Sequence, residues 1–184
     1  MRVYEPTVRP GFEWVLPVRD TDNETLWSLD GTPRQATWQP VPVTRLTTAD
    51  DGTQRAEADL PWLGSHVLVL RARAAEALAP LLEPHGELLP LACPDANLWL
   101  YNATTVIDAL DESRSKLIRF DDGTILAIEH YEFRPERLTP VFKVPQLLRG
   151  PLFVTEELAE AITTAGLTGL DLTELWKGPT PASS

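Results

Sequence analysis

Proline placement is the feature that most restricts how this 184-residue chain folds. Six of its 17 prolines fall in the first 42 residues: Pro6, Pro10, Pro17, Pro33, Pro40 and Pro42. Proline lacks the backbone N–H and fixes φ, so it interrupts helices and is confined to the edges and ends of sheets. Residues 1–60 are therefore predicted to be irregular, with short extended segments at 12–16 and 37–41, and to pack on residues 61–177.

A stretch of the opposite character follows, and it has the pattern of a strand–helix–strand unit. Residues 67–70 (VLVL) form an apolar run typical of a buried strand. Over 71–83 apolar side chains recur on one face of a helix, and Pro84 ends that helix. Residues 86–91 return to an extended pattern, which completes the first predicted unit.

The same order recurs near the C-terminus. Residues 152–154 are predicted to form a strand, with Thr155 as the N-cap of a helix that has two acids in its first turn. The predicted buried face of this helix comprises Leu158, Ala161, Ile162 and Ala165. Gly166 supplies the left-handed residue that ends a helix, and 170–176 alternate apolar and polar residues as a strand does.

The segment between the two units is predicted to be a meander. Residues 98–101 and 141–144 are typical of strands, and 103–110 are predicted to form a short helix or turn. Residues 116–120 and 125–133 flank an Asp-Gly turn, which predicts a central hairpin. We therefore expect an α+β fold with a mixed or mainly antiparallel sheet, two strand–helix–strand units and this hairpin.

Composition excludes several classes of protein. Sixteen basic and 27 acidic side chains give a net charge of −11, which argues against binding a nucleic-acid backbone. The single cysteine, Cys93, rules out a disulfide framework and a cysteine-rich zinc site. No signal peptide or membrane-spanning run is visible, so we expect a cytoplasmic protein that does not bind membranes, with residues 178–184 as a flexible tail.

Tests for catalytic chemistry give no candidate. Ser65 and His66 are neighbours, which in a strand places them on opposite faces, and no Gly-x-Ser-x-Gly motif is present. The three histidines have no metal-ligand spacing and are expected to be exposed or lightly buried. The glycine pair at 166 and 169 lacks the lysine of a nucleotide-binding loop. We therefore predict no catalytic residue, no metal and no cofactor.

Acidic side chains remain as the candidate binding surface. Asp108, Asp111 and Glu112 are spaced so that a helix would place them on one face, and Asp121 and Asp122 lie in the hairpin turn. Such a patch attracts a basic partner through charge complementarity. The alternative is that two of these carboxylates share general acid–base work in a small hydrolase.

Several motifs together resemble an immunity protein family of bacterial polymorphic toxin systems, first catalogued as a domain of unknown function. The segments that carry the resemblance are 31–34 (GTPR), 38–40 (WQP), 60–64 (LPWLG), 81–90 (LLEPHGELLP), 102–111 (NATTVIDALD) with Ser115, 120–123 (FDDG), 152–156 (LFVTE), 165–169 (AGLTG) and Trp176. The resemblance covers roughly residues 30 to 177. These motifs comprise turns, caps and core strands, and they include no catalytic signature.

We therefore expect residues 1–177 to form a single immunity-like domain. The resemblance implies a cytoplasmic antidote that binds a cognate toxin domain and blocks it without chemistry. Toxins that attack nucleic acids have basic clefts, which an acidic protein can occupy. The remaining alternative to immunity and to a hydrolase is an accessory or scaffolding protein.

Overall fold

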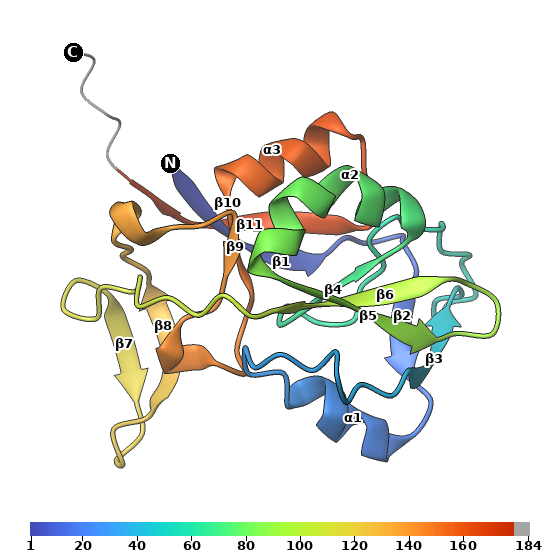
Figure 1. The fold of residues 1–184 in the computed structure, drawn as a ribbon, viewed down its shortest axis with the longest axis horizontal. Helices are drawn as coiled ribbons and strands as arrows, with labels where there is room; N and C mark the ends of the chain where they lie inside the picture. The colour runs from blue at the N-terminus through green and yellow to red at the C-terminus, as the bar shows by residue number, and fades with distance from the viewer. Residues whose placement is uncertain (179–184) are drawn as a thin grey trace.

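The computed structural model of the chain describes residues 1–178 and has an α+β fold (Figure 1). The elements in chain order are β1 (Arg2–Val8), β2 (Trp14–Pro17), α1 (Asp20–Trp27), β3 (Val41–Leu46), β4 (Leu68–Leu70), α2 (Ala72–Leu82), β5 (Gly86–Ala92), β6 (Leu98–Ala103), β7 (Lys116–Arg119), β8 (Ile125–His130), β9 (Val141–Phe142), β10 (Phe153–Thr155), α3 (Glu156–Thr164) and β11 (Leu170–Lys177), with short 3-10 turns η1 (Glu83–His85), η2 (Pro135–Arg137) and η3 (Pro145–Leu147). No helix among these residues is long and apolar enough to cross a membrane.

The strands form three sheets of different size. One has the order β11-β1-β10-β9, the second has the order β2-β3-β5-β6-β4, and β7 and β8 form a two-stranded sheet by themselves. All strand pairs are antiparallel except β3 with β5, so the larger of the sheets is mixed.

Both predicted strand–helix–strand units are present, as β4-α2-β5 and β10-α3-β11. In each unit the two strands do not pair with each other, because one antiparallel strand lies between them: β6 in the first and β1 in the second. The second helix ends as predicted, since Gly166 has φ of +60° and Leu167 N–H donates to the carbonyl of Ile162. Thr155 occupies the N-cap position, but its side chain makes no capping hydrogen bond.

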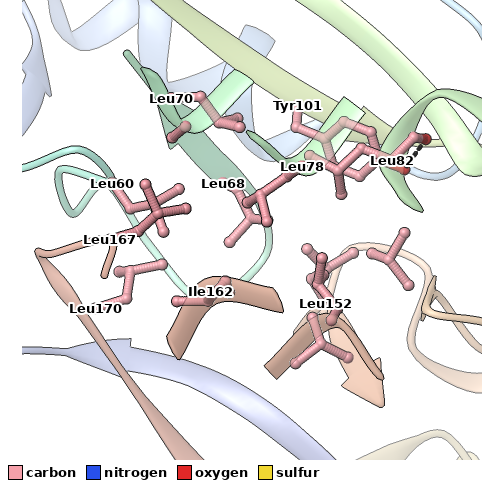
Figure 2. Close-up of a cluster of buried hydrophobic side chains, with 14 of the residues drawn as sticks. Leu60, Leu68, Leu70, Leu78, Leu82, Tyr101, Leu152, Ile162, Leu167 and Leu170 are labelled. Carbon is pink, nitrogen blue, oxygen red and sulfur yellow. Dashed lines mark hydrogen bonds between the residues drawn. The ribbon is translucent and has the colours of Figure 1, made fainter. Parts of the chain in front are cut away.

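The two units share one core. Helices α2 and α3 lie side by side over the sheets in Figure 1, and Figure 2 shows the leucines and Ile162 that meet beneath them. Leu60, Leu167 and Leu170 converge there although they come from distant segments. Tyr101 closes one end of this cluster, with its hydroxyl donating to the Leu82 carbonyl at 2.9 Å.

The prediction that residues 1–60 are irregular is wrong. This part contains β1, β2, α1 and β3, and it contributes residues to all three buried clusters. Strand β1 lies inside a sheet although it contains Pro6. Its partner β10 pairs only with Val3 and Tyr4, so Pro6 has a neighbouring strand on the β11 side alone. The N–H that Pro6 lacks therefore leaves no carbonyl of β10 without a hydrogen-bond donor. The segment predicted at 37–41 is also misplaced, because β3 begins at Val41.

Residues 103–110 do not form the predicted helix or turn. Ala103 ends β6, and the chain continues without regular helix to Leu110. Its backbone pairs with a distant segment instead, because Lys143 N–H donates to the carbonyl of Thr105 and Ile107 N–H donates to that of Lys143. Of the predicted tail, Gly178 N–H donates to the carbonyl of Met1, and 179–184 lie outside the described residues.

Candidate partner-binding surface

The five predicted acidic residues lie around the β7–β8 hairpin and share no helix. Asp108 is in the extended stretch after β6, and Asp111 and Glu112 lie in the turn that leads into β7. Asp121 and Asp122 form the tip of the hairpin. In Figure 1 the hairpin stands at the lower left, clear of the two larger sheets, with β7 on the outer side. The structure therefore separates the five acids into a base group and a tip group.

Asp108 and Glu112 are neutralised within the chain. Arg134 Nη1 donates to Asp108 Oδ2 at 3.0 Å, and Arg119 Nη2 donates to Glu112 Oε2 at 2.6 Å. Gln146 joins them, because its Nε2 donates to Asp108 Oδ1 at 3.3 Å and to Glu112 Oε1 at 2.9 Å. The bonds from Gln146 and Arg119 lower the pKa of Glu112. These two carboxylates tie η3 to the hairpin base.

Asp111 and Asp122 have a different role, since each closes a local turn. Asp111 Oδ1 accepts hydrogen bonds from the Ser113 hydroxyl at 2.6 Å and its N–H at 3.2 Å. Asp122 Oδ1 accepts the corresponding bonds from Thr124 at 2.6 and 2.9 Å. Each hydroxyl bond is the main reason that the pKa of the carboxyl lies below its ordinary value. Both side chains are therefore fixed in place and ionised at neutral pH.

Three of the five acids form no ion pair within the described chain. Within residues 1–178, Asp111, Asp121 and Asp122 form no ion pair. The segment 111–132 contains three basic and six acidic side chains, a net charge of −3. The hairpin and its base thus present an excess of negative charge to solvent.

The hairpin is anchored to the body by one of its faces. Leu117 and Ile128 lie opposite each other across the two strands and therefore share a face. Ile128 packs against the cluster that contains Phe133, Phe142, Phe153 and Trp176. The pairing contains two bulges, at Leu126 and Glu129 of β8, whereas every residue of β7 is paired in turn. The hairpin is thus held by the face that contains Ile128, and β8, the strand nearer the body, contains the two bulges.

Apolar side chains gather on the exposed part of the hairpin. Ile118, Phe120 and Leu126 have 39%, 54% and 55% of their surface exposed. Single exposed apolar side chains are ordinary on protein surfaces, and these three lie within nine residues of one projecting ribbon. We call these three side chains with Asp121 and Asp122 the hairpin tip surface. The sequence predicts the turn and its two acids, but not the exposure of the apolar side chains beside them.

A buried charge network is the first feature that sequence reasoning missed. Glu13 has no exposed surface, and its carboxylate accepts bonds from Arg45 Nε at 2.7 Å and Arg71 Nη2 at 2.6 Å. The N–H of Ala58 donates to it as well, at 3.2 Å. Burial by itself would raise the pKa of Glu13, but the bonds from Arg71 and Arg45 hold it below its ordinary value. The three charged residues are far apart in sequence, so no local pattern reveals them.

A second missed feature is the buried pair His66 and Lys143. Lys143 has no exposed surface, and its Nζ donates to the His66 carbonyl at 3.3 Å. The expectation of exposed or lightly buried histidines is wrong for His66, which is 3% exposed. Its ring stacks on Trp27 with centroids 4.0 Å apart, and neither ring nitrogen has a hydrogen-bond partner within the described chain.

Burial sets the protonation of this pair. It lowers the pKa of His66 to about 4, with the nearby Lys143 charge acting in the same direction. Burial also lowers the pKa of Lys143 to about 8, and Asp30 opposes that shift. His66 is therefore neutral at pH 7. Lys143 remains mostly charged, and it ties the chain at 141–144 to the segment that contains His66.

Neither a metal centre nor a known family identifies the site. Across residues 1–178, no group of three or more histidine, cysteine or acidic side chains is arranged to hold a metal ion. Cys93 is half-buried, with its thiol 3.2 Å from Asp95 Oδ1, and burial raises its pKa. Comparison with protein-family models and with curated proteins finds no match to this chain.

Proposed function

We propose that this chain is a non-catalytic immunity-type protein that binds a cognate toxin domain and blocks it. The observation that carries the proposal is the hairpin tip surface with Asp111 beside its base. It combines exposed apolar side chains with carboxylates that have no ion pair in residues 1–178. Apolar centres surrounded by polar and charged residues are the usual composition of protein–protein contacts, and charge complementarity selects the partner.

The charge of the surface indicates a basic partner. The whole chain has a net charge of −11, and the segment 111–132 contributes −3 of it. A nucleic acid, which is itself negative, would be repelled. A toxin that acts on nucleic acids has a positive substrate cleft, so a nuclease is the toxin class that we favour. Such a toxin meets its substrate in the cytoplasm, and we propose that its antidote acts there.

The alternative of a small hydrolase is less well supported. General acid–base catalysis needs two carboxyl groups with different proton affinities in a concave, water-poor site. Asp108 and Glu112 are the two that come together, but each is bound to an arginine and their side chains are 53% and 41% exposed. That arrangement favours ionised, structural carboxylates. No observation specifically favours an accessory or scaffolding role.

We expect the adjacent gene to encode this toxin domain, and co-expression of the chain with that domain tests the proposal. The chain should restore growth and co-purify with the toxin. A triple variant in which Asp111, Asp121 and Asp122 become asparagine should lose most of the protection, because it removes charge while asparagine can still accept the turn bonds. Affinity measured by calorimetry should fall at least about tenfold, the scale of one or two lost charge contacts.

A matched triple variant provides the control. Asp50, Glu76 and Glu157 are exposed and form no ion pair within residues 1–178, so replacing them by their amides changes the net charge equally. This variant should protect as the unmodified chain does. If both triple variants lose protection and affinity equally, the effect would come from the overall charge and not from the hairpin. Failure of the unmodified chain to bind the toxin would refute the proposal.

A further inference from the structure

We propose that the hairpin tip surface mimics a nucleotide inside the toxin's substrate cleft. Phe120 would take the place of a base, and Asp121 and Asp122 would take the place of phosphates. This inference rests on the proposed function and specifies the partner surface more closely. It requires a cleft that binds single-stranded nucleic acid or an extruded base.

The chemistry of such clefts matches the tip. Proteins that bind single strands line a positive groove with aromatic side chains, on which the bases stack. Phe120 is an aromatic residue that is 54% exposed, and two carboxylates follow it directly in the chain. Ile118 and Leu126, which are also exposed, lie on the two strands on either side of the turn. Ring and charges therefore occur together, as base and phosphate do in a nucleotide.

The tip is organised before it meets a partner. Phe120 N–H donates to the Thr124 carbonyl and Gly123 N–H donates to that of Phe120, both at 2.9 Å. Gly123 has φ of +86°, a left-handed conformation that favours glycine in this turn. Because the turn is already closed by these bonds and by those of Asp122, binding orders few additional groups and costs little conformational entropy.

Arg119 connects the tip to the hairpin base. Its Nη1 donates to the Gly123 carbonyl at 2.7 Å, and its Nη2 donates to Glu112 Oε2 at 2.6 Å. Glu112 is in turn held by Gln146. The one arginine next to the tip is thus engaged on both sides, and it leaves Asp121 and Asp122 without an ion pair in the described chain.

Charge also decides between a basic cleft and a second copy of this chain. Two copies of the segment 111–132, each with a net charge of −3, would repel when brought together. The same negative charges would be attracted to a cleft lined by lysine and arginine. Contact between the hairpins of two copies is therefore disfavoured, and binding of the hairpin to a nucleic-acid-binding cleft is favoured.

Competition for the toxin tests this inference. The probe is a single-stranded phosphorothioate oligonucleotide, which nucleases cleave poorly, bound to the toxin domain encoded by the adjacent gene. The chain should displace the oligonucleotide. Phe120→Ala should weaken displacement at least about 30-fold, the scale of an aromatic anchor. Phe120→Trp should retain it, because indole also stacks on an aromatic surface.

Val18→Ala is the matched control, since Val18 is 59% exposed in the loop between β2 and α1, away from the hairpin. It should displace the oligonucleotide normally, and circular dichroism should show all three variants folded. Tight toxin binding without displacement would overturn the mimicry and leave the proposed function standing. No toxin binding by the unmodified chain would overturn both. A dimer in sedimentation that Phe120→Ala dissociates would reassign the surface to a second copy.

Discussion

Glu13 and Asp121 are both carboxylates, but the fold treats them in opposite ways. Glu13 has no exposed surface and receives hydrogen bonds from two arginines and one backbone N–H. Asp121 stands at the hairpin tip beside the exposed ring of Phe120 and has no ion pair in residues 1–178. The first charge is neutralised from several sides, and the second faces water.

The difference separates residues that the fold needs from residues that it does not. Burying a charge costs several kcal/mol unless partners neutralise it, so the network around Glu13 is a requirement of folding. An exposed charge and a half-exposed aromatic ring satisfy no such requirement. Their presence together on the hairpin therefore supports the proposed partner.

Removal of Glu13 should have the largest effect on stability. Glu13→Ala leaves Arg45 and Arg71, which are 16% and 17% exposed, without their principal partner. We expect the free energy of unfolding to fall by about 3–5 kcal/mol in urea titrations. A loss below about 1 kcal/mol would mean that buried and exposed carboxylates are not distinguished as we describe.

Acid should destabilise the fold through His66. In the unfolded chain this histidine titrates near its ordinary pKa of 6.5, and in the fold its pKa is about 4. Between these values only the unfolded state binds the proton, so stability is lost as the pH falls from 6.5 to 4. The full loss is on the order of 3 kcal/mol. It is measured by urea unfolding at several pH values.

The variant His66→Phe isolates this contribution, because it keeps a ring stacked on Trp27 and cannot take up a proton. Its free energy of unfolding should depend less on pH than that of the unmodified chain over the same interval. If the free energies of unfolding of the two proteins fall equally with pH, the loss of stability in acid would belong to the carboxylates instead. Replacement of His130, whose side chain is 61% exposed, by glutamine is the matched control and should change the free energy of unfolding little.

The hairpin tip should show the smallest effects on stability. Asp122→Asn can keep an oxygen for the Thr124 bonds, and Asp121→Asn removes no ion pair found in residues 1–178. Each should change the free energy of unfolding by less than about 0.5 kcal/mol. Thermal unfolding is sufficient to measure this. A loss comparable with that of Glu13→Ala would place the tip among the residues that the fold requires.

The elements that could be predicted from sequence are those whose signals are local. Apolar periodicity, Gly166 and the Asp-Gly step give α2, α3 and the hairpin with nearly correct bounds. The failures occur where distant backbone decides the structure. Residues 103–110 pair with Lys143, and β1 tolerates Pro6 because β10 is short.

The candidate site was predicted in the same partial way. The five acids could be found from the sequence, but their roles depend on Arg119, Arg134 and Gln146, which lie elsewhere in the chain. The apolar residues of 116–120 and 125–128 indicate strands whether the hairpin is buried or projects into solvent. Exposure of Phe120 is therefore a tertiary property that the sequence pattern does not contain.

Hydrogen exchange of the chain with and without the toxin domain tests the central claim most directly. If the hairpin tip surface enters the toxin, amides in 116–130 should gain protection on binding, with the turn at 120–124 gaining most. The segments that form α2, α3 and the Glu13 network should exchange as they do in the free protein. Protection confined to α2 and α3, with the hairpin unchanged, would contradict the account.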